Sequence, residues 1–120
     1  MTIVVAHSTT PESAAALEAA YGEAERRPGE PVVVFVLDGD APDVSGATAR
    51  GITVTFEHPK EFEKDPVGGV VDAATALDAS VLVIGIKHRT ATGKLLFGSS
   101  AQRILLDATC PVLAVKVAQG

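Results

Sequence analysis

The sequence of 120 residues is poor in cysteine, in aromatic side chains and in long apolar runs. Its single cysteine, Cys110, cannot form an internal disulfide, and no Cys/His spacing typical of a metal site is present. No uncharged run approaches the roughly 18 residues that span a membrane, and the N-terminus lacks the basic and apolar regions of a signal peptide. Because 47% of the residues are apolar, the chain is still able to form a core. These features predict a single cytoplasmic domain, residues 1–120, without a membrane anchor.

Basic residues are also scarce, and they are unevenly placed. The chain has 10 lysines and arginines against 15 acids, a formal charge of −5. This balance argues against a general nucleic-acid binder. Three of the bases, Lys87, Arg89 and Lys94, fall with His88 in a stretch that contains no acid. An acidic chain with one basic loop favours a small anionic ligand over a polymer, although an ordinary solvated loop has the same composition.

Apolar runs predict an α/β fold built on a mostly parallel sheet. Most of the runs are continuous, which indicates strands that are covered on both faces. One run, 52–56, alternates with period two and is expected near the sheet edge. The predicted strands are 2–6, 31–37, 52–56, 80–85 and 111–117.

Helix signals lie between the strands. Thr10 and Asp65 are predicted N-caps, each followed by a proline at the first helical position. Ser99 with Gln102 three residues later forms a capping-box pattern for the last helix. The stretch 38–50 is rich in aspartate, glycine and proline and predicts a loop with at most one short helix. The apolar face of the last helix is predicted to consist of Ala101, Ile104, Leu105 and Ala108.

The segment 83–100 carries the most informative functional pattern. A buried strand ends at Gly85, a basic loop follows, and a helix begins near Gly98 and Ser99. In a parallel sheet this order places backbone N–H groups and a helix N-terminus where phosphates bind. Neither a Walker loop nor a Rossmann fingerprint is present. Simpler interpretations stay open, with Ser99 acting only as a helix cap and the two glycines only as turn residues.

The spacing of Gly85, position 88, Gly98 and Ser99 resembles the universal stress protein signature G-x2-G-x9-G-[S/T], and the resemblance covers most of the chain. It implies a flavodoxin-like, open five-stranded sheet in the order 3-2-1-4-5 with helices on both faces. It also implies a stress-response role and a homodimer formed through the last strand, 111–117. One branch of the family binds ATP, with Mg²⁺, or related adenine nucleotides such as AMP.

For that branch, the resemblance assigns roles to individual positions. The ribose contact falls at Ser8 and the edge of adenine at Val36. The positions that the resemblance places near the phosphates are Gly85, Gly98, Ser99 and Ser100, and His88 and Lys94 are candidate phosphate donors because of their charge.

Three features depart from the family pattern. His88 replaces the middle glycine, Ser8 replaces the aspartate that contacts ribose, and the helix between strands two and three is reduced or absent. His88 either closes the pocket or joins Lys94 in donating to a phosphate, depending on whether glycine was needed there. Two functions therefore stay open: a nucleotide-binding module and a non-binding dimeric interaction module.

Catalysis has little support in the sequence. His7 and Ser8 are neighbours at a strand end, where successive side chains point to opposite faces, so they form a poor base–nucleophile pair. Neither a nucleophile elbow nor a zinc-protease motif is present. The chain is expected not to be an enzyme, with ATP hydrolysis as the residual alternative.

Overall fold

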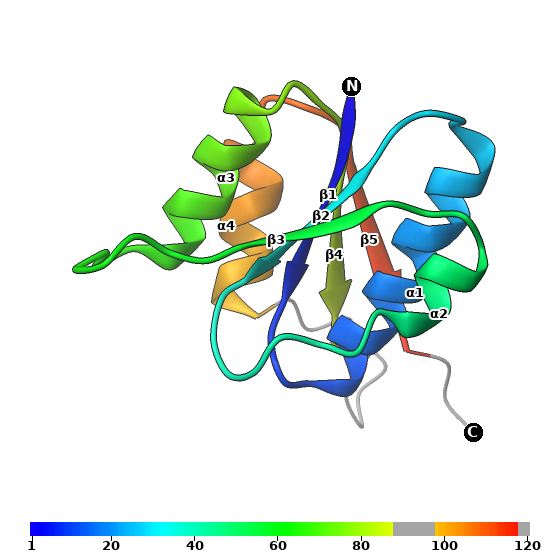
Figure 1. Cartoon of the computed structure of the whole chain (residues 1–120). Coiled ribbons are helices and arrows are strands. Elements are labelled where there is room, and N and C mark those ends of the chain that lie inside the picture. The colour runs from blue at the N-terminus through cyan, green and yellow to red at the C-terminus, as the bar shows by residue number, and fades with distance from the viewer. Residues whose placement is uncertain (88–97, 118–120) are drawn as a thin grey trace.

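The computed structural model describes residues 1–87 and 98–117, in which strands and helices alternate along the chain (Figure 1). The strands are β1 (Thr2–His7), β2 (Val32–Val36), β3 (Val54–Glu57), β4 (Ala79–Ile86) and β5 (Val112–Lys116). The helices are α1 (Pro11–Arg26), α2 (Ser45–Ala49), α3 (Pro66–Ala76) and α4 (Ser99–Asp107). No helix in these residues is long and apolar enough to cross a membrane.

The five strands form one sheet in the order β3-β2-β1-β4-β5, and every neighbouring pair is parallel. This confirms the expected α/β fold and its strand order. At the carboxyl edge of the sheet His7 pairs with Val36 of β2, and further along Gly85 of β4 pairs with Val115 of β5. The alternating run 52–56 was expected near the sheet edge, and β3, which begins two residues later at Val54, is an edge strand.

A separate apolar core lies on each face of the sheet. On one face, Ile3 and Val5 of β1 pack with α1 and with Ala47 of α2. On the other, Val4 and Ala6 pack with α3 and α4. β1 therefore contributes alternate residues to two cores, which is why its sequence is apolar throughout.

The expected N-caps of α1 and α3 are confirmed. The Thr10 hydroxyl accepts from the Ser13 N–H at 3.1 Å, and an Asp65 carboxylate oxygen accepts from the Gly68 N–H at 3.1 Å. Each cap satisfies a backbone donor that a helix start leaves without an intrahelical partner.

Two predictions for α4 are wrong. Gly98, not Ser99, occupies the N-cap position, with extended φ −60° and ψ 159°, so Ser99 is already helical and forms no cap. Leu105 is 40% exposed instead of lying on the apolar face, whereas Ala101, Ile104 and Ala108 pack with the core as predicted.

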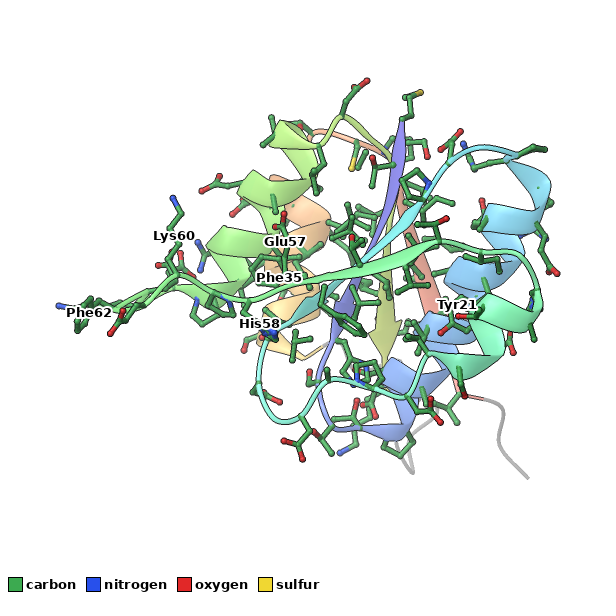
Figure 2. The ribbon with its side chains drawn as sticks, viewed as in Figure 1. Tyr21, Phe35, Glu57, His58, Lys60 and Phe62 are labelled. Carbon is green, nitrogen blue, oxygen red and sulfur yellow. The ribbon has the colours of Figure 1, made fainter. Side chains whose placement is uncertain are left out.

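The segment between β2 and β3 contains only α2, five residues long, which confirms a reduced helix. Arg50, directly after α2, attaches this segment to α1. Its guanidinium donates to Glu18 and to Glu25, each at 2.6 Å, and lies 5.4 Å from the centre of the Tyr21 ring. Figure 2 shows Tyr21 between α1 and α2. The short segment therefore still covers its face of the sheet.

Candidate functional site

A cleft of about 340 Å³ opens at the carboxyl ends of β1 and β4. These two strands are neighbours, but the chain leaves them in opposite directions, to β2 and to β5. Such a switch point is where open α/β sheets bind ligands. The lining residues are Ser8, Thr10, Glu12, Ser13, Gly85, Ile86, Lys87, Gly98, Ser100 and Ala101.

The structure brings four of the expected site residues together. Ser8, Gly85, Gly98 and Ser100 all line this cleft, although they come from three distant parts of the chain. A smaller hollow of about 70 Å³ shares Ser8, Gly85 and Ser100 with the cleft and is also lined by Leu37.

The other expected site residues lie elsewhere. Val36 is 3% exposed and belongs to the core on the α1 face. Ser99 is exposed at the start of α4 and does not line the cleft. His88 and Lys94 lie outside the described residues.

The turn between β1 and α1 forms one wall of the cleft and is held by hydrogen bonds. The buried Ser13 hydroxyl accepts from the Ser8 N–H at 3.0 Å and from the Thr10 hydroxyl at 3.0 Å. The Thr10 N–H in turn donates to the Ser8 carbonyl at 2.9 Å. Because backbone and side chains hold one another here, this wall is fixed before any ligand arrives.

Gly85 is required by packing. A Cβ at this position would overlap the backbone carbonyl of Glu12, so only glycine lets the first turn of α1 approach the end of β4 this closely. Neither sequence interpretation of Gly85, as phosphate contact or turn residue, included this role. Its cause is a contact between residues 73 positions apart, which local sequence does not show.

Gly98 differs from Gly85 because no close packing contact requires glycine there. Its φ of −60° is open to any residue, and a Cβ there would meet nothing within 4 Å. The fold therefore does not require glycine at this position. Among the described residues, nothing lies within 4 Å of the place where a side chain at position 98 would begin.

The other wall of the cleft, at the start of α4, presents backbone N–H groups that no described residue accepts from. The first α-helical hydrogen bond of α4 runs from the Gln102 N–H to the Gly98 carbonyl at 3.0 Å. The N–H groups that precede Gln102 therefore have no acceptor within the helix. No side chain caps α4 within the described residues. Helix N-termini attract anions, and α1 also begins at this edge (Figure 1).

The chain matches known proteins over most of its length. A model of the universal stress protein family matches residues 45–116. A universal stress protein from Mycolicibacterium smegmatis is 42% identical over 127 residues, which cover 95% of this chain and 96% of the relative. The chain belongs to the universal stress protein family.

Solved structures of universal stress proteins share this fold. One from Archaeoglobus fulgidus is 34% identical, with a TM-score of 0.76, and the match covers 97% of this chain and 98% of that one. A second structure from this organism, a complex with dAMP, is 30% identical with a TM-score of 0.70 and the same coverage.

This universal stress protein also has a buried histidine beside the site. His7 is 7% exposed, and its Nδ1 has no hydrogen-bond partner in the described part of the chain. Burial lowers the pKa of His7, against the opposing charge of Asp38. Ser8 lines the cleft, whereas His7 is buried and is not among the described residues that line it, so the structure gives no support to a His7–Ser8 catalytic pair.

Metal and thiol chemistry find little support in the structure. Residues 1–87 and 98–117 contain no group of histidine, cysteine, aspartate and glutamate side chains able to hold a metal. Cys110 is half-buried, and burial raises the pKa of its thiol. A raised pKa makes the reactive thiolate scarcer at neutral pH.

Sequence reasoning did not assign three residues of the β1–α1 wall to the site: Thr10, Glu12 and Ser13. The sequence did contain a signal that places these three residues at the site. These residues open the helix that directly follows β1, and β1 is a switch-point strand once the sheet order 3-2-1-4-5 is accepted.

Proposed function

We propose that this domain is a non-enzymatic stress-response module that binds an adenine nucleotide in the cleft between β1 and β4. The observation that carries the proposal is the uncapped first turn of α4, which faces a cleft at the switch point of the sheet. The bound ligand is AMP, or ATP with Mg²⁺. The dAMP complex of the 30% identical relative supports an adenine nucleotide.

The phosphate end of the nucleotide lies against α4. Backbone N–H groups before Gln102 and the Ser100 hydroxyl supply donors, and Lys87 adds a positive charge on the neighbouring strand end. The absence of a side chain at Gly98 lets an anion reach those donors. Donors fixed in this way bind a phosphate at low entropic cost, because folding has already ordered them.

Calorimetric titration at physiological salt tests the proposal. AMP, Mg-ATP and cyclic AMP are the ligands, and inorganic triphosphate is the control. Micromolar binding of an adenine nucleotide without binding of triphosphate is expected. Equal binding of all polyanions would reduce the site to a basic patch, and no binding would leave the interaction module as the function.

A pair of lysine variants localises the binding. Lys87→Ala is expected to weaken nucleotide binding, because it removes a charge that lines the cleft. Lys64→Ala removes the same charge from the exposed loop that projects from the molecule, with Phe62 near its tip (Figure 2), and is expected to leave binding unchanged. Equal losses in both variants would indicate non-specific attraction to positive charge. ATP turnover above a buffer blank would contradict the non-enzymatic assignment.

The second part of the proposal is a homodimer through residues 111–117. β5 is an edge strand, and Val112 to Val115 are only half-buried. Leu106 of α4, which leads into β5, is 76% exposed. Pairing with a second copy would cover apolar surface and satisfy the open strand edge. Sedimentation equilibrium is expected to give the mass of a dimer, and a monomer at all concentrations would contradict it.

A further inference from the structure

One side chain in the cleft does not suit a phosphate. Glu12, in the first turn of α1, is the single acidic residue among the described residues that line the cleft. An ionised carboxylate only accepts hydrogen bonds and repels an anionic ligand group. If a nucleotide occupies the cleft, Glu12 must therefore face a part of it that carries donors.

The position of Glu12 is tightly set. Its backbone carbonyl packs against Gly85 so closely that no Cβ fits between them. One residue further along, Ser13 is bonded to both Ser8 and Thr10. The Glu12 side chain is half-buried at the edge of this fixed turn. The backbone of Glu12 is therefore fixed beside the cleft before a ligand binds, which lowers the cost of placing its carboxylate against a donor.

The two walls therefore offer opposite chemistry to one ligand. The α4 wall presents N–H donors and the Ser100 hydroxyl, whereas the α1 wall contributes an acidic residue, Glu12. A nucleotide whose phosphate lies on α4 carries its next strong donors on the sugar, as hydroxyl groups. A carboxylate is a stronger acceptor for such groups than the Ser8 hydroxyl, because its charge strengthens the hydrogen bond.

We propose that Glu12 accepts hydrogen bonds from the sugar hydroxyls of the nucleotide and so makes the site selective for ribose. This inference rests on the proposed nucleotide function. It makes Glu12 a specificity-determining residue that acts on the ligand directly, in addition to any favourable interaction of its charge with the start of α1.

A cycle of one protein variant and one ligand change tests the inference. AMP and 2′,3′-dideoxy-AMP are titrated into the wild type and into Glu12→Gln, with EDTA present so that no metal takes part. Glu12→Gln is expected to weaken AMP binding about tenfold, the loss of a charged hydrogen bond, and to leave dideoxy-AMP binding within about twofold. Glu61→Gln, in the projecting loop, is the matched control and is expected to change neither affinity.

Each other outcome overturns the inference in a distinct way. An equal loss for both ligands would mean that Glu12 shapes the cleft without contacting the sugar. Equally tighter binding of both would mean that its charge only repels the phosphate. An effect that appears with Mg-ATP but not with AMP in EDTA would make Glu12 a metal ligand. Absence of AMP binding to the wild type would instead overturn the nucleotide function itself. Thermal unfolding of Glu12→Gln shows whether the variant is folded.

Discussion

The two walls of the cleft differ in how their backbone polar groups are satisfied. On the α1 side, the hydroxyls of Ser13 and Thr10 accept hydrogen bonds from backbone N–H groups of the turn. Gly85 lets the backbone of α1 contact the end of β4 directly. On the α4 side, Gly98 contributes no side-chain cap, and no described atom lies within 4 Å of the place where its side chain would begin. Folding satisfies the donors of the first wall, whereas the described residues contain no acceptor for the first N–H groups of α4, and we propose that a ligand satisfies them. The same residue type, glycine, is structural in the first wall and dispensable to the fold in the second.

The largest expected effect on the free energy of unfolding distinguishes Gly85 from Gly98. Gly85→Ala forces a methyl group into the Glu12 backbone and is expected to lower the free energy of unfolding by about 3 kcal/mol. Gly98→Ala meets no described atom within 4 Å and is expected to cost at most about 1 kcal/mol, because alanine is a poorer N-cap than glycine. Urea unfolding measures both. Equal losses would contradict the distinction between the walls.

The next effect concerns the hydrogen bonds of the α1 wall. Ser13→Ala leaves the Ser8 N–H without its acceptor and is expected to cost about 1–3 kcal/mol of unfolding free energy. Ser13→Thr keeps an acceptor oxygen and serves as the comparison in the same urea experiment. If Ser13→Ala unfolds at the wild-type urea concentration, the turn is not held in the way described.

A third effect, on pH dependence, comes from His7 at the end of β1. Because burial lowers its pKa from the ordinary 6.5, the unfolded chain binds a proton before the folded chain does. Stability is therefore complete above pH 6.5 and falls as the pH drops from there toward the lowered folded pKa, by at most about 1.4 kcal/mol per pH unit.

Removal of the imidazole identifies the source of that slope. His7→Phe is expected to abolish the fall in stability in this window, whereas the exposed His58→Phe is expected to retain it. Urea unfolding between pH 7 and pH 5 measures the slope. An unchanged slope in His7→Phe would assign the pH dependence to another group.

The smallest expected effect concerns the start of α4. Ser99→Ala is expected to change the unfolding free energy by less than about 0.5 kcal/mol, since Ser99 is exposed and makes no cap. Loss of a true capping serine costs about 1 kcal/mol. A loss of that size in a thermal or urea unfolding curve would restore the capping box that the structure does not contain.

Much of the fold follows from local sequence patterns. Continuous apolar runs identified the buried strands, and the Thr10-Pro11 and Asp65-Pro66 pairs located the starts of α1 and α3. The strand order came from the resemblance to a family. The start of α4 was misplaced by one residue because Gly98 and Ser99 are both acceptable at an N-cap, and the sequence does not say which is extended.

The site was less accessible to sequence reasoning than the fold. Ser8, Gly85, Gly98 and Ser100 were expected together because the resemblance to the family assigns all four to one nucleotide site. Glu12 was missed, since its place in the cleft depends on a close contact between α1 and β4. Such a contact is set by tertiary packing and leaves no periodic pattern in the sequence.

A bound nucleotide is expected to accept hydrogen bonds from the N–H groups of the α4 wall and to leave the α1 wall unchanged. Titration of ¹⁵N-labelled protein with AMP measures this through the backbone amide resonances. We expect the amides of Ser99, Ser100 and Ala101 to shift strongly and saturate, and the Ser13 amide, already bonded to Thr10, to shift little. Saturating shifts at Ser13 without shifts at Ser100, or no shifts at all, would contradict this expectation.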